Sequence, residues 1–82
     1  MIHVSYRGRL AELTGCSEEQ IEAARVSDVL NHIKKRYGAQ AHREANRHLI
    51  AVDRKSITLL DGRRTVLTEG CTVGFLPICG GG

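Results

Sequence analysis

The first residues of the chain alternate between large and polar side chains. Ile2, Val4 and Tyr6 are separated by polar residues, and a period of two is typical of a strand with one buried face. Apolar residues then recur at helical spacing over residues 26–37, and Gly38 is well placed to end the helix. The pattern therefore predicts an opening strand and one main amphipathic helix.

Shorter patterns predict the remaining elements. Residues 9–15 have the pattern of a short helical turn closed by a glycine, and residues 39–47 are expected to form a loop or a loose helical turn. Consecutive apolar residues in the segment 48–53 favour a central strand with both faces covered. The other strands are expected at residues 20–24, 56–60 and 72–76.

The order of these elements predicts the fold class. The chain has 82 residues, and an amphipathic helix packed on one face of a mixed sheet is the simplest arrangement of one helix and several short strands. We therefore expect an α+β protein with the β-grasp, or ubiquitin-like, fold and a sheet of about four to five strands packed on one main helix. The β-grasp domain is expected over residues 1–79, followed by a flexible C-terminal glycine tail at residues 80–82.

Composition narrows the classes of partner. Apolar residues make up 41% of the chain and charged residues 26%, which is ordinary for a globular domain. The net charge is +3, but the basic residues are scattered except for the short runs at residues 34–36 and 63–64, and the aromatic residues number two tyrosines and one phenylalanine. Surfaces that bind nucleic acid usually combine a basic stripe with exposed aromatic side chains. We therefore expect no nucleic-acid partner.

The cysteines and histidines do not have metal-binding spacings. Cys16, Cys71 and Cys79 match neither a zinc site, nor a disulfide framework, nor the spacing of plant-type iron–sulfur ferredoxins. The four histidines show no HExxH or comparable spacing, so no metal site is expected. Without a signal-peptide pattern or a long apolar run, the sequence favours a cytoplasmic protein that does not associate with membranes.

The segment before the glycines predicts a surface for a partner protein. Alternation along the strand at residues 72–76 directs Val73 and Phe75 into the core and Leu76 outward. Leu76, together with the Pro77 and Ile78 that follow it, would form an exposed apolar patch. The expected partner-binding residues are Leu76, Pro77 and Ile78, assisted by Leu59 or Leu60.

The same segment resembles a known family. Residues 67–82 contain a turn ending in Gly70, a strand, Pro77 and a terminal diglycine. This order resembles the sulfur-carrier family of ubiquitin-like β-grasp proteins, which includes the small subunit of molybdopterin synthase and the thiamine-pathway sulfur carrier. The resemblance extends to residues 2–15 and 26–30 in the same order.

The resemblance implies a role for each terminal glycine. An ATP-dependent activating enzyme, an adenylyltransferase, would adenylate the carboxylate of Gly82, and sulfur would then replace AMP to form a thiocarboxylate. Gly80 and Gly81 would thread through a narrow slot into the active site of a larger synthase subunit, since glycine has no side chain to obstruct the passage. The chain itself would bind no cofactor, and it would be a carrier rather than an enzyme.

Details of the segment favour one branch of that family. The run Phe75–Leu76–Pro77 is closer to the molybdopterin branch, which implies a role in molybdenum cofactor biosynthesis. Cys71, Ile78 and Gly80 depart from the residues common in the family, but Gly81 and Gly82 do not.

Several alternatives stay open. The chain could be a carrier for thiamine or another thio-cofactor, a ubiquitin-like modifier conjugated to proteins through Gly82, or an interaction module with a passive tail. A sulfur relay at Cys79 is a further alternative, although no neighbouring residue in the sequence is suited to lower the pKa of its thiol.

Overall fold

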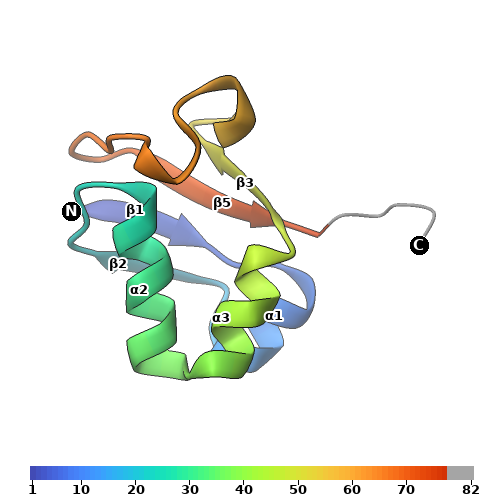
Figure 1. Ribbon diagram of the computed structural model, residues 1–82. Helices are drawn as coiled ribbons and strands as arrows, with labels where there is room; N and C mark the ends of the chain where they lie inside the picture. Colours follow the sequence, from blue (N-terminus) through green and yellow to red (C-terminus); the bar gives the residue numbers. More distant parts are fainter. Residues whose placement is uncertain (78–82) are drawn as a thin grey trace.

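The computed structural model describes residues 1–77 as a mixed sheet with helices on one face (Figure 1). The strands are β1 (Ile2–Ser5), β2 (Glu18–Ile21), β3 (Leu49–Val52), β4 (Lys55–Ser56) and β5 (Thr72–Leu76). The α-helices are α1 (Gly8–Thr14), α2 (Val26–Tyr37) and α3 (Ala39–Asn46), and two 3₁₀ helices follow β4, namely η1 (Ile57–Leu59) and η2 (Gly62–Arg64). This architecture confirms the predicted α+β class and the β-grasp arrangement.

The strand order places the last strand at the centre of the sheet. The order is β2-β1-β5-β3-β4, with β1 and β5 parallel and the other neighbouring pairs antiparallel. Strand β5 therefore lies in the middle of the sheet, and β3, predicted to be central, is also internal, with β5 and β4 as its partners and Ile50, Ala51 and Val52 buried. Because β1 and β5 come from opposite ends of the sequence, their pairing brings the start of the chain against its last strand.

The core lies between the sheet and the helices. Val73 and Phe75 of β5 are completely buried, as the alternation of the strand predicted. The Phe75 ring stacks on Tyr6 with a centroid distance of 5.9 Å. On the helix side the core is completed by fully buried residues of α1 and α2, namely Leu10, Val26, Val29 and Ile33.

Helix α2 confirms the clearest sequence prediction, including both of its ends. It spans Val26–Tyr37, and Asp28 accepts a hydrogen bond from the backbone N–H of Arg25 at 3.0 Å, which stabilises the first turn. Gly38 has a φ of 97° and its N–H donates to the carbonyl of Lys34 at 3.0 Å, which ends the helix.

Two segments differ from their predictions because tertiary contacts decide them. Residues 39–47, expected to be a loop or a loose helical turn, instead contain the regular helix α3, whose Ala41 and Ala45 are buried one helical turn apart. Their small side chains allow close packing against the other helices, but they make only a weak hydrophobic pattern in the sequence. Strand β2 begins at Glu18, two residues earlier than predicted, because pairing of Ile21 with Ile2 sets its register.

The predicted strand at residues 56–60 is mostly wrong. Strand β4 ends at Ser56, and the chain turns into the 3₁₀ helix η1. The Ser56 hydroxyl accepts a hydrogen bond from the N–H of Thr58 at 3.3 Å, which stabilises the turn instead of an extended strand.

Within residues 1–77, no helix combines the length and the apolar character that crossing a membrane would require.

Candidate functional site

The outer face of the sheet carries the predicted partner-binding residue Leu76. On β5, Val73 and Phe75 point to the helices, whereas Gly74 and Leu76 point to the opposite face. The Leu76 side chain is 37% exposed. The structure thus confirms the outward direction of Leu76 that the strand alternation predicted.

A second exposed leucine lies beside Leu76. The register of β3 and β5 pairs Leu49 with Leu76, and paired residues of antiparallel strands point to the same face. Leu49 is 41% exposed, so the two side chains form an apolar pair at the end of the sheet. Sequence reasoning missed Leu49 because it belongs to a continuous apolar run. The available signal was the two-residue spacing between Leu49 and Ala51, which places both on the same face of the strand.

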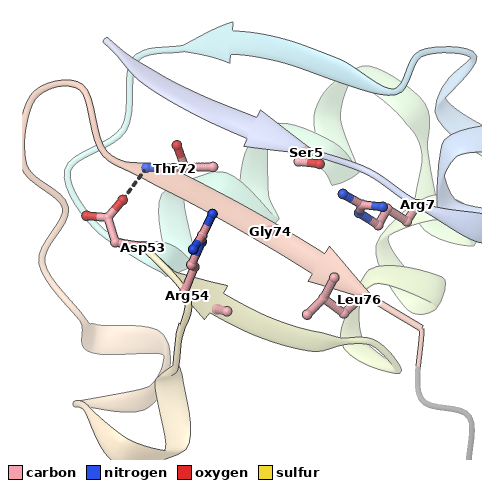
Figure 2. Close-up of a pocket in the computed structure, with 8 residues that line it drawn as sticks. Ser5, Arg7, Asp53, Arg54, Thr72, Gly74 and Leu76 are labelled. Carbon is pink, nitrogen blue, oxygen red and sulfur yellow. Dashed lines mark hydrogen bonds between the residues drawn. The ribbon is translucent and has the colours of Figure 1, made fainter.

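Next to this pair, the sheet face contains a groove of about 420 Å³ (Figure 2). Three small residues in one row across the sheet form its floor, because Gly74 pairs with Ser5 of β1 and with Ala51 of β3. Its rim is formed by Arg7, Asp53, Arg54, Thr72 and Leu76. The groove therefore joins β1, β3 and β5 with the turn between β3 and β4.

The turn between β3 and β4 is anchored to the beginning of β5. The Asp53 N–H donates to the Thr72 carbonyl at 2.8 Å, and the Asp53 Oδ1 accepts from the Thr72 N–H at 2.9 Å. Asp53 and Arg54 have φ values of 47° and 73°, a left-handed conformation that is uncommon for residues other than glycine. The turn therefore holds two strained residues at the rim of the groove.

The other predicted contact residues lie at different distances from the groove. Pro77 is exposed and lies beside the start of α1, where a Cβ built at Gly8 would be 3.8 Å from the Pro77 ring. Leu59 is 79% exposed on η1, but it is not among the residues that line the groove. Its role as a partner contact stays a prediction.

The remaining predicted site residues, Ile78, Gly80, Gly81 and Gly82, lie outside the described residues, as does Cys79.

A polar cluster stabilises the opposite face of β1. The carboxylate of Glu19 accepts hydrogen bonds from the hydroxyl of Tyr6, from the hydroxyl of Tyr37 at 3.0 Å and from Nε2 of His32 at 3.1 Å. Burial acts to raise the pKa of Glu19, but these donors together outweigh it and lower the pKa. Burial, together with hydrogen bonds to Cys16 and Glu19, raises the pKa of Tyr37 to about 12. The cluster links Tyr6, which follows β1, to β2 and α2, and none of its residues lines the groove.

Residues 1–77 contain no group of three or more histidine, cysteine, aspartate or glutamate side chains placed to hold a metal ion.

Comparison with known proteins gives a family and several structural relatives. Residues 4–82 match the model of the ThiS family. No curated protein sequence matches significantly. A Pyrococcus furiosus protein provisionally described as molybdopterin converting factor, subunit 1, is 30% identical, with a TM-score of 0.74 over 93% of this chain and 94% of that one.

Two further structures are similar at lower identity. A chain of the Amycolatopsis orientalis BexX/CysO complex has a TM-score of 0.83 at 20% identity, with complete coverage of both chains. The small archaeal modifier protein 1 from Methanosarcina acetivorans has a TM-score of 0.80 at 22% identity, over 99% of this chain and 95% of that one. At such identities the likeness supports the fold alone.

Proposed function

Because the chain belongs to the ThiS family of ubiquitin-like sulfur carriers, we propose that it carries sulfur as a thiocarboxylate on Gly82. The observation that carries the proposal is the family match over residues 4–82, which includes both the folded domain and the three glycines. The sheet supports it, since the central strand β5 ends at Leu76, four residues before the first of those glycines in the sequence.

The proposed chemistry follows from the weak reactivity of a carboxylate. An oxygen of the Gly82 carboxylate attacks the α-phosphorus of ATP, pyrophosphate leaves, and an acyl adenylate forms. Hydrosulfide from the sulfur donor then attacks the carbonyl carbon, AMP leaves with the electrons of the broken C–O bond, and loss of the sulfur-bound proton gives the thiocarboxylate. Glycine suits both steps because no Cβ shields the carbonyl carbon. The ATP is bound by an adenylyltransferase partner, and this chain is the carrier substrate.

The outer face of the sheet is the proposed docking surface for the activating enzyme and for a larger synthase subunit. Ordering three glycines in a slot costs on the order of 3–6 kcal/mol, from roughly 1–2 kcal/mol per residue. Burying an aliphatic side chain contributes roughly 1.5–3 kcal/mol, so contacts at Leu76, Leu49 and Pro77 are of the right size to offset that cost.

We propose the molybdenum cofactor pathway as the recipient of the sulfur. The support is the 30% identity to the Pyrococcus furiosus protein, together with the Phe75–Leu76–Pro77 run. The archaeal modifier protein shares the fold at 22% identity, so conjugation through Gly82 is the alternative that an experiment must separate.

The test is an intact-mass measurement of the full chain after incubation with a cognate activating enzyme, ATP and a sulfur donor. The proposal predicts a mass increase equal to the exchange of one oxygen for sulfur, which requires ATP and disappears when Gly81 and Gly82 are deleted. An unchanged mass with an active enzyme would contradict the proposal. Isopeptide-linked remnants of the tail on lysines of other proteins would instead identify a modifier.

A further inference from the structure

At two positions of the groove, the residue type is not the one that the local backbone conformation favours. Gly74 lies in the middle of the central strand β5, where a side chain would stabilise the strand. Arg54 has a φ of 73°, a conformation that favours glycine. The chain therefore has a glycine where a side chain would suit the fold, and an arginine where glycine would suit it.

Folding does not require glycine at position 74. Of the glycines in residues 1–77, Gly74 alone lacks a positive φ, and a Cβ built on it would meet no atom within 4 Å. Its partners in the sheet, Ser5 and Ala51, are also small. The three residues leave a floor low enough for the backbone of another protein to approach the sheet closely.

The strained turn presents Arg54 at the rim of this floor. Hydrogen bonds between Asp53 and Thr72 hold the turn against the sheet, so that the unfavourable backbone conformation is maintained by its surroundings. Figure 2 shows Arg54 and Arg7 on either side of Gly74. Neither arginine forms an ion pair with another residue of the described part of the chain.

We propose that the groove binds an acidic segment of the activating enzyme, which lies across Gly74 and places its carboxylates on Arg7 and Arg54. Guanidinium groups bind carboxylates through paired hydrogen bonds, and Leu76 at the rim supplies an apolar contact beside them. The identity of the partner rests on the proposed function. The acidic chemistry of the segment rests on the groove itself.

The first experiment uses steady-state adenylation of the full chain by the enzyme that thiocarboxylates it. The variant Gly74→Thr adds a β-branched side chain at a floor position where a Cβ would meet no atom within 4 Å, and Arg54→Gly removes the charge and the strained backbone, so both variants should remain folded. Each is expected to raise the KM for the carrier about tenfold at low salt, with kcat within about twofold of the wild type because the tail is unchanged. For Arg54→Gly the difference should shrink as salt screens the charges.

Arg64→Gly is the matched control for the loss of one positive charge, since Arg64 is exposed on η2 and does not line the groove. Its KM should stay within about twofold of the wild type. A KM unchanged by Gly74→Thr would overturn the close approach of a partner at the floor. A KM increase for Arg54→Gly that does not depend on salt, or an equal increase for Arg64→Gly, would overturn the acidic segment.

A second measurement does not depend on the activating enzyme. Titration of the isotope-labelled full chain with a hexaglutamate peptide should shift the NMR signals of the Ser5, Ala51 and Gly74 amides, and a hexalysine peptide should not. Gly74→Thr should abolish these shifts. Equal shifts around Arg63 and Arg64 would overturn a groove-specific site. Failure of the wild-type chain to gain sulfur, with the peptide shifts present, would contradict the proposed function but not the acidic specificity.

Discussion

The two faces of strand β5 follow different rules. On the inner face, Val73 and Phe75 are completely buried and pack as the alternating pattern predicts. On the outer face, Gly74 weakens the strand and Leu76 exposes 37% of its surface. The inner face is therefore explained by folding alone, whereas the outer face is not. Departures from local preference confined to one face are typical of a surface kept for binding.

The largest expected effect is on the inner face. Phe75→Ala removes a fully buried ring that stacks on Tyr6, so it should lower the free energy of unfolding by about 3–5 kcal/mol. Urea denaturation followed by circular dichroism measures the change. Leu76→Ala on the outer face should lose less than about 1 kcal/mol. Similar losses of unfolding free energy for Phe75→Ala and Leu76→Ala would contradict the distinction between the two faces.

The next effect is on the outer face and concerns binding. Leu76→Ala should raise the KM for the carrier in adenylation about tenfold, because burial of a leucine on the partner is lost. Urea denaturation should show that Leu76→Ala lowers the free energy of unfolding by less than about 1 kcal/mol, because the side chain is partly exposed. The KM increase then reports weaker binding rather than unfolding. Leu59→Ala on η1 should raise the KM less, by about two- to threefold, since Leu59 is predicted only to assist Leu76 and lies outside the groove. An equal effect at Leu59 would extend the contact surface to η1.

A smaller effect concerns the polar cluster on the inner side of β1. Because the pKa of Glu19 is lowered in the folded protein, its carboxylate contributes stability above its unfolded pKa and loses it as the pH falls through the folded value. Glu19→Gln should therefore reduce the free energy of unfolding by about 1 kcal/mol at pH 7. The two proteins should converge in acid, below the ordinary value of 4.5. A difference in the free energy of unfolding between the two proteins that grows in acid would contradict the lowered pKa of Glu19.

The smallest effect concerns glycine itself. Gly74→Ala should raise the free energy of unfolding by about 0.5–1 kcal/mol, because its backbone conformation and surroundings accept a Cβ. Gly15→Ala is the matched control: its Cβ would also meet nothing, but its φ is 77°, so the same change should be destabilising by about 1 kcal/mol. Thermal unfolding of both variants measures the difference. A loss of stability at Gly74 would mean that folding, not binding, selects the glycine.

Part of the candidate site could be predicted from local sequence. The outward direction of Leu76 followed from the two-residue period of β5, and the bounds of α2 followed from helical spacing and from Gly38. Leu49 could not be placed beside Leu76, because strand register depends on pairing between distant segments. Helix α3 was missed because buried alanines produce little periodic signal.

The sequence by itself determined the elements with a regular hydrophobic period, namely the strands β1 and β5 and the helix α2. It also determined the α+β class and the family resemblance of the segment that ends in glycines. Only the tertiary structure decided that Ser5, Gly74 and Ala51 form one row, and that Arg7 and Arg54 lie on either side of it. The physical reason is that periodicity reports how an element packs, whereas the groove depends on strand pairing and on a turn whose conformation opposes local preference.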